Sequence, residues 1–168
     1  MRKIGLWIVL GCWLCAGAIV ASAGTRKAGL WELTTTMTWQ QSPTIPGTEG
    51  DALKGGTHTK DVCLTQEMID TYGALLPQSR GQCSIANKVV KPGGMTADWV
   101  CTGMMSGKGA LESSWTDTEH AKGKVHFVGT FLVGSELQPV EWTTESTSVF
   151  KSADCGLVKP QSLPGKRH

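Results

Sequence analysis

The sequence predicts a mainly β protein, an antiparallel meander of about seven strands that forms a curved sheet or a barrel-like fold, with one short helix and two disulfides. Apolar and polar residues alternate along much of the chain, and a period of two is typical of strands with one buried face. Short segments containing Gly and Pro separate these stretches, which favours hairpins between consecutive strands. Four cysteines downstream of an amino-terminal leader complete the pattern.

The leader has the features of an export signal. Arg2 and Lys3 precede an uncharged run from Ile4 to Val20, and residues 21–23 (Ala-Ser-Ala) form a small-x-small cleavage site. An uncleaved membrane anchor is the alternative, since the uncharged run is just long enough to cross a bilayer. The cleavage site favours a signal peptide over residues 1–23, a mature chain that begins near Gly24, and a periplasmic protein without stable membrane insertion after cleavage.

Composition favours a single neutral domain. Two of the sixteen basic residues lie in the leader, so the mature chain carries fourteen basic and fourteen acidic residues. This balance argues against a nucleic acid partner, which requires a basic face to neutralise phosphates. We expect one β-rich domain over residues 24–168, with its core over about 29–156 and a flexible tail over 157–168.

The four mature cysteines predict disulfides. They are Cys63, Cys83, Cys101 and Cys155, an even number in a chain with an export signal. No two of them are separated by only two residues, so neither a thioredoxin-type redox pair nor a zinc site is indicated, and we expect no metal. Three pairings are possible; we favour Cys63 with Cys83 and Cys101 with Cys155, which would tie the last strand to the middle of the sheet.

The first strand has the clearest alternation. Trp31, Leu33, Thr35, Met37 and Trp39 fall on one face, and polar residues fall between them. A segment rich in Gly and Pro follows over residues 41–56. This loop is longer than most connections, which indicates that it is either mobile or functional.

A short strand and the one convincing helix come next. The strand covers residues 57–63 and leads into a helix from Thr65 to about Tyr72. Thr65 can accept hydrogen bonds from the first free amides, and Glu67 in the first turn suits the helix dipole. Gly73 is expected to end the helix.

Alternation then predicts five further strands, over residues 84–91, 95–102, 109–116, 124–132 and 140–150. The expected turns and loops lie over residues 92–94, 103–108, 117–123 and 134–139. Strands this close in sequence pair most simply as a meander.

These features carry a family resemblance. The motifs are Gly29-Leu30-Trp31-Glu32 before a Thr-rich strand, Cys63-Leu64-Thr65 at a helix start, Leu75-Leu76-Pro77, Cys83, Trp99-Val100-Cys101 and Cys155-Gly156. With them the chain resembles, from about Gly29 to Gly156, the bacterial envelope family called domain of unknown function 3617. It departs from the usual ending, where a Gly-rich basic stretch tends to precede the last cysteine, because Lys151-Ser152-Ala153-Asp154 stands there. The resemblance implies no established activity.

Residues that could carry chemistry are scattered. His58, His120 and His126 have no partner at helical ligand spacing, and His126 should face away from the apolar side. The segment 103–109 fails the spacing of both a nucleophile elbow and a phosphate loop. We therefore expect no catalytic residues, no cofactor and no enzyme, although a cleft joining His58, Asp61 and Glu67 would argue for one.

Tryptophans form the candidate ligand site. Trp31, Trp39, Trp99, Trp115 and Trp142 all fall on predicted strands at apolar positions. They either fill the core of a curved sheet or line a hollow interior that binds a small apolar molecule. Two functions stay open: a binding module for such a ligand or for an envelope protein, and a structural or stress-related module acting through an exposed strand edge or the 41–56 loop.

Overall fold

A computed structural model describes residues 26–46, 55–73, 76 and 82–161. The predicted signal peptide (1–23), residues 47–54 of the predicted loop and residues 162–168 of the predicted tail lie outside the described residues. Residues 74–75 and 77–81, which include part of the Leu75-Leu76-Pro77 motif, lie outside them too.

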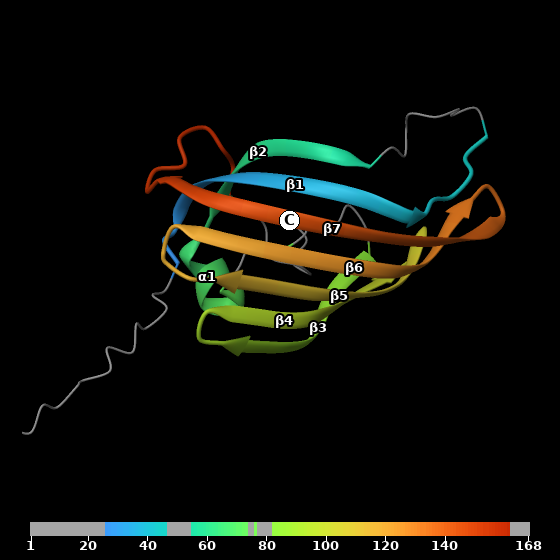
Figure 1. Ribbon diagram of the computed structural model, residues 1–168, viewed down its shortest axis with the longest axis horizontal. Helices are drawn as coiled ribbons and strands as arrows, with labels where there is room; N and C mark the ends of the chain where they lie inside the picture. The colour runs from blue at the N-terminus through green and yellow to red at the C-terminus, as the bar shows by residue number, and fades with distance from the viewer. Residues whose placement is uncertain (1–25, 47–54, 74–75, 77–81, 162–168) are drawn as a thin grey trace, which may run out of the picture.

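The described chain forms one sheet of seven antiparallel strands and one helix, which confirms the predicted fold class (Figure 1). In chain order the elements are β1 (Gly29–Gln41), β2 (Gly56–Leu64), α1 (Gln66–Tyr72), β3 (Gln82–Lys91), β4 (Gly94–Thr102), β5 (Met105–Trp115), β6 (His120–Val133) and β7 (Glu136–Ser152).

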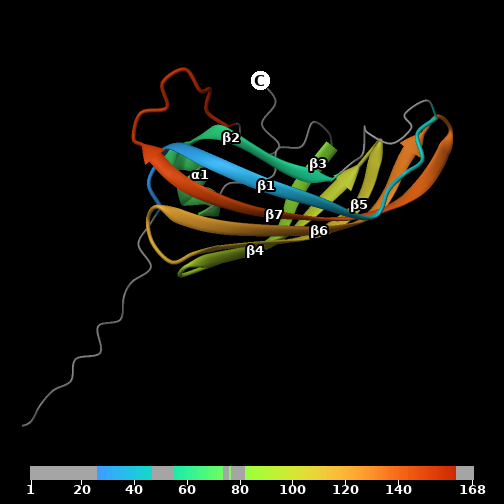
Figure 2. The same cartoon turned by 45° about the horizontal axis from the view of Figure 1, so that its top comes forward.

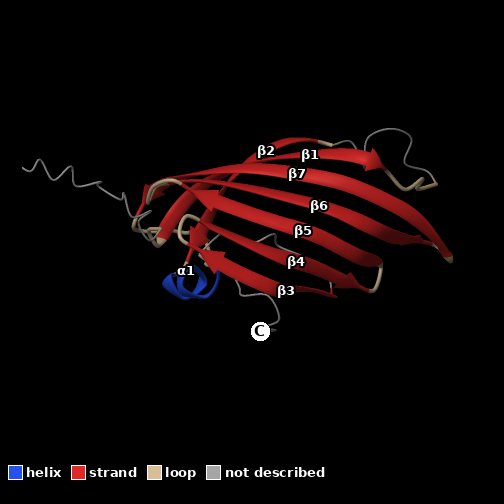
Figure 3. Ribbon diagram, turned by 60° about the horizontal axis from the view of Figure 1, so that its bottom comes forward, coloured by secondary structure: helices blue, strands red, loops and turns tan. Residues whose placement is uncertain are grey.

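The sheet is a curved, open sheet in which the two edge strands are consecutive in sequence. Its order is β2-β1-β7-β6-β5-β4-β3, so a meander from β3 to β7 joins the β1–β2 hairpin through the β1–β7 pair. The chain therefore crosses from one edge to the other between β2 and β3, and α1 lies on this crossing. Figures 2 and 3 show the sheet arching over the side on which α1 lies, which we call the concave face.

Several strands are longer than predicted. β5 begins at Met105, β6 at His120 and β7 at Glu136, so most of the residues assigned to loops 103–108 and 134–139 belong to strands. The prediction interpreted the glycines of these segments as loop residues. Gly107 instead lies within β5, where a Cβ would lie 2.6 Å from Gly129 Cα and 3.0 Å from Phe127 Cζ, so glycine is needed there for close packing. Pro139 has no backbone N–H to donate to a neighbouring strand. It is tolerated within β7 because β1 pairs with β7 only from Glu141 onward, so residue 139 lacks a partner on that side.

The four cysteines form two disulfides, but the favoured pairing was wrong. The bonds join Cys83 to Cys101 and Cys63 to Cys155, with Cα–Cα distances of 4.0 and 5.5 Å. Cys63 cannot reach Cys83, because β2 and β3 are opposite edges of the sheet.

Each disulfide has a simple origin in the topology. Cys83 and Cys101 face each other directly in the β3–β4 register. After β7 the chain returns to β2, where Pro160 forms a bridge with Cys63 and the Gln161 backbone N–H donates to the Cys63 carbonyl oxygen at 3.2 Å. The Cys63–Cys155 bond therefore fastens this returning segment to the edge strand.

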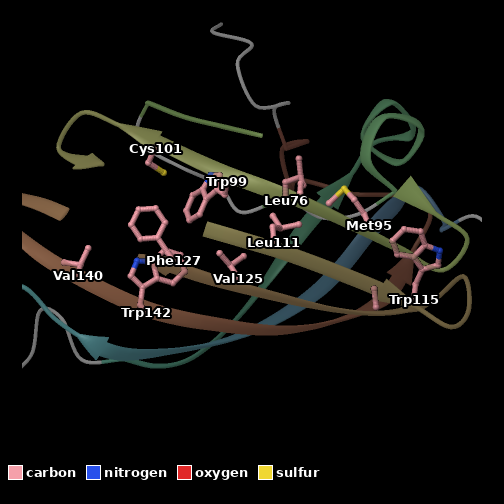
Figure 4. Close-up of a cluster of buried hydrophobic side chains, with 12 residues drawn as sticks. Leu76, Met95, Trp99, Cys101, Leu111, Trp115, Val125, Phe127, Val140 and Trp142 are labelled. Carbon is pink, nitrogen blue, oxygen red and sulfur yellow. The ribbon is translucent and has the colours of Figure 1, made fainter. Parts of the chain in front are cut away.

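A first core lies under the meander (Figure 4). Its centre is an aromatic group in which Phe127 is fully buried, stacks on Trp142 at 5.3 Å and meets Trp99 edge-on at 5.9 Å. The buried members of this first core are Leu76, Met95, Ala97, Trp99, Cys101, Leu111, Trp115, Ala121, Val125, Phe127, Val140 and Trp142.

A second core joins α1 to the β1–β2 hairpin. It consists of Trp31, Val62, Leu64, Met68 and Ile69. The predicted caps of α1 are present: the Met68 backbone N–H donates to Thr65 Oγ1 at 3.2 Å, and Gly73 adopts the left-handed conformation with φ of 64°. The helix thus covers one end of the concave face.

Arg26 is an unusual buried cation beside this second core. It is 4% exposed, its guanidinium lies 4.3 Å from the centre of the Trp31 ring, and Nη2 donates to Ser148 Oγ at 3.2 Å. Its Nε has no hydrogen-bond partner, and among the described residues no carboxylate pairs with it. Burial lowers the pKa of Arg26 to about 10.

The Arg26→Met substitution is expected to leave the free energy of unfolding unchanged or to raise it by about 1 kcal/mol, because it keeps an unbranched chain against Trp31 and removes a poorly satisfied charge. Arg26→Ala should lower it by about 1–2 kcal/mol through lost packing. Urea unfolding of the three proteins measures both changes. Equal losses for the two variants would contradict this account.

Candidate ligand cavity on the concave face

A polar row crosses the concave face between the two cores. Thr35 of β1 pairs with Ser146 of β7, Ser146 with Gly123 of β6, and Gly123 with Ser113 of β5. These residues are all partly exposed, whereas the neighbouring rows contain the buried Val125 and larger side chains. Small side chains in one row of a curved sheet leave space above that row.

A cavity of about 260 Å³ occupies this space. Its walls come from six strands, from Leu76 before β3 and from the segment that follows β7. The lining residues are Leu33, Thr35, Lys60, Leu76, Trp99, Leu111, Glu112, Ser113, Gly123, Lys124, Val125, Trp142, Thr144, Ser146 and Gln161. The cavity is slightly smaller than the roughly 300 Å³ at which drug-sized ligand pockets begin.

One end of the cavity is aromatic and aliphatic. Trp99 from β4 and Trp142 from β7 come from distant parts of the chain, and their rings meet edge-on at 5.6 Å. Gly109 of β5 permits this approach, because it pairs with both Trp99 and Phe127 and leaves room for their rings. Figure 4 shows Leu111 and Val125 beside the two indoles.

The other end is polar and belongs to β2. Lys60 pairs with Leu33 and so projects from β2 on the concave face. Gln161 lies beside Cys63, held there by the bridge at Pro160. Strand alternation places the side chains of Glu112 and Lys124 on the opposite face, where Lys124 pairs with Glu145 at 3.4 Å.

Two of the five predicted tryptophans line this cavity. Trp99 and Trp142 do so, whereas Trp31 is fully buried in the second core and Trp115 is buried against α1 near Gly73. Trp39 is partly buried and packs on the first core. The interior is therefore neither wholly filled nor wholly hollow.

Sequence reasoning missed Lys60 and Gln161. Alternation within β2 places Lys60 on the same face as Val62, which is a signal that could have identified it. No comparable signal exists for Gln161, because its position depends on the return of the chain from β7 to β2.

The convex face carries the titratable pairs. As predicted, His126 is exposed between the buried Val125 and Phe127, and its Nε2 lies 2.9 Å from Glu141 Oε1. His120 Nδ1 lies 3.0 Å from Asp117 Oδ2. The backbone N–H of Glu119, together with contacts from His120, lowers the pKa of Asp117 below its usual value. These exposed pairs are surface contacts.

His58, Asp61 and Glu67 do not share one cleft, the arrangement that would have argued for an enzyme. His58 pairs with Thr35, and Asp61 pairs with Glu32, so alternation places the two side chains on opposite faces of β2. Within the described part of the chain no group of three or more His, Cys, Asp or Glu residues could hold a metal ion.

A larger hollow of about 770 Å³ lies on the convex face. Its walls are mostly exposed hydroxyl and charged side chains such as Thr36, Lys122 and Glu145, and no aromatic residue is among the described residues that line it. We attribute it to the twist of the sheet and regard the smaller concave cavity, with its two indoles, as the candidate ligand site.

Fold and site together define a disulfide-bonded antiparallel β domain with a cavity on the concave face of an open sheet. The chain belongs to the family described as "Protein of unknown function (DUF3617)", whose model matches residues 26–155. This confirms the resemblance found in the sequence. Comparisons with curated proteins and with solved structures found no match.

Two findings bear on where the domain resides. Two disulfides are typical of domains that fold in an oxidising compartment. None of the helical structure in the described ranges is long and apolar enough to span a membrane.

Proposed function

We propose that this protein is an exported, non-enzymatic binding module that holds a small apolar molecule in its concave cavity. The observation that carries the proposal is the cavity itself, which lies between two separate cores and has Trp99 and Trp142 in its wall. Indole rings provide large apolar contact surfaces with little conformational freedom to lose, as ligand sites require. The export signal and the disulfides support a periplasmic location.

The volume of the cavity limits the size of the ligand. A cavity of about 150 Å³ holds one benzene molecule, so 260 Å³ suits a molecule of about ten to twelve non-hydrogen atoms. A short alkyl chain or a single substituted ring is the size of ligand that fits.

The lining supports binding over catalysis. Among the described residues that line the cavity there is no histidine, cysteine or aspartate, and the one glutamate, Glu112, belongs by alternation to the convex side. Hydroxyl groups of Thr and Ser supply most of its polarity, and these groups orient a ligand without an adjacent base to activate them.

Action through a strand edge has less support. Pro160 bridges the edge of β2 at Cys63, and the β3 ladder is irregular between Ala86 and Val89, where Asn87 has a positive φ of 49°. Both features hinder the addition of another strand.

Filling the cavity tests the proposal. Ser146→Phe places a ring in the space above the polar row, and we expect it to weaken binding of 1-octanol by about tenfold or more, measured by isothermal titration calorimetry. Thr147→Phe is the matched control, because it adds the same ring one residue away on the convex face. Failure of the unmodified protein to bind 1-octanol, or equal loss in both variants, would contradict the proposal.

A further inference from the structure

One polar atom in the cavity wall is sealed from every partner. Gln161 Oε1 has no surface that solvent reaches, and nothing in the described part of the chain donates a hydrogen bond to it. A ligand held in the cavity does not reach this atom either. Because a buried acceptor without a partner costs free energy, the amide of Gln161 has an unfavourable position in the wall. It gains a partner only by leaving that position.

The backbone of Gln161 is held in place, but its side chain has a route to solvent. The Gln161 backbone N–H donates to the Cys63 carbonyl oxygen at 3.2 Å, next to the bridge at Pro160, and the Cys63–Cys155 disulfide fastens the same segment. Gln161 as a whole is partly exposed. Rotation about its own side-chain bonds between staggered rotamers therefore carries the amide from the wall into water, with no movement of the backbone.

This side chain lies where a longer ligand needs room. The indoles of Trp99 and Trp142 form one end of the cavity, and Gln161 lines it on the side of β2. The volume of about 260 Å³ suits a ligand of about ten to twelve non-hydrogen atoms while the side chain stays in the wall. A glutamine side chain contains roughly five such atoms, so its departure makes room for a similar number.

Resting on the proposed function, we propose that Gln161 is a movable wall residue that sets the length of apolar chain the protein accepts. Short ligands occupy the cavity with the Gln161 side chain in the wall. A longer alkyl chain, with one end against Trp99 and Trp142, turns this side chain out to solvent. The amide then regains hydrogen bonds with water, which offsets the cost of the movement. The ligand class thus extends to single alkyl chains of medium length.

Two alcohols that differ only in length test the inference: 1-octanol fits the cavity as it stands, and 1-dodecanol exceeds it. Titrations followed by tryptophan fluorescence should show 1-dodecanol binding at least about tenfold tighter, because more methylene groups are buried. In Gln161→Leu this advantage should fall to about threefold or less, because leucine loses apolar contact when it turns out to water. Lys159→Leu, at an exposed position of the same segment outside the cavity lining, is the matched control and should keep the full advantage.

The side-chain amide of Gln161 reports the movement itself. In ¹⁵N spectra we expect its Nε2 signals to move to the position of a solvated glutamine in the 1-dodecanol complex and to keep their position in the 1-octanol complex. The amide of Gln138 is the internal control. It donates to the Thr44 carbonyl oxygen at 3.1 Å and accepts from the Thr44 backbone N–H at 2.6 Å, so its signals should stay in place in both complexes.

The outcomes separate this inference from the proposed function. If the Gln161 amide does not move with 1-dodecanol, or if Gln161→Leu keeps the full advantage of the longer alcohol, the inference is overturned and the wall is fixed at this residue. The proposed function then stands, provided that 1-octanol binds and Ser146→Phe weakens its binding. If neither alcohol binds the unmodified protein, both are overturned.

Discussion

Replacing Phe127 with alanine is expected to lower the free energy of unfolding by about 3–5 kcal/mol, the usual cost of removing a fully buried aromatic ring. The ring lies at the centre of the first core, stacked on Trp142 and edge-on to Trp99. Glycines surround it: a Cβ on Gly107 would lie 3.0 Å from Phe127 Cζ, and one on Gly129 would lie 2.9 Å from Cε1. Several strands are therefore shaped around this one side chain, and removing it leaves a void that they cannot easily close.

Urea unfolding at fixed pH measures the loss. Val128→Ala is the matched control, since Val128 is the next residue of β6, is 52% exposed on the other face, and should cost less than about 0.5 kcal/mol. A loss below about 1 kcal/mol for Phe127→Ala would show that the aromatic group is not the centre of the core.

Removing the Cys63–Cys155 bond is expected to be the second large effect. This bond closes 92 residues, whereas Cys83–Cys101 closes 18, so the chain-entropy model gives the longer loop the greater stabilisation. We expect the Cys63→Ala/Cys155→Ala variant to lose about 4.5 kcal/mol and the Cys83→Ala/Cys101→Ala variant to lose about 3 kcal/mol.

Denaturant unfolding of the two double variants tests this order directly. The Cys63–Cys155 variant should also lose ligand affinity, because Gln161 is held beside Cys63 by the segment that this bond fastens. If the Cys83→Ala/Cys101→Ala variant loses as much free energy of unfolding as the Cys63→Ala/Cys155→Ala variant, or more, then structure remaining in the unfolded chain outweighs loop entropy.

Local patterns predicted most of the secondary structure. Alternation from Trp31 to Trp39 located β1, and Thr65 with Gly73 located α1, because these features depend on residues close in sequence. The same reasoning failed for the start of β5, where Gly107 was assigned to a loop. Its role depends on Phe127 of the neighbouring strand, which no local pattern reveals.

Contacts between distant segments were the harder part. The disulfide pairing follows from β2 and β3 being the two edges of the sheet, and that order depends on β7 pairing with β1. The candidate site also depends on contacts between distant segments. The alternation of residues along each strand placed five tryptophans on the apolar face, but only the pairing of strands shows that Trp99 and Trp142 face the cavity. Gln161 reaches the site through the return of the chain after β7.

The central claim is that the concave cavity binds a ligand beside two particular indoles. A nitrogen–proton correlation spectrum of the oxidised, ¹⁵N-labelled protein, recorded during titration with 1-octanol, tests it most directly. We expect the indole signals of Trp99 and Trp142 to shift, while that of Trp31, whose Nε1 donates to the Lys27 carbonyl oxygen at 3.0 Å inside the second core, stays in place. Unmoved signals for Trp99 and Trp142, or equal shifts at all the tryptophans of the domain, would contradict the claim.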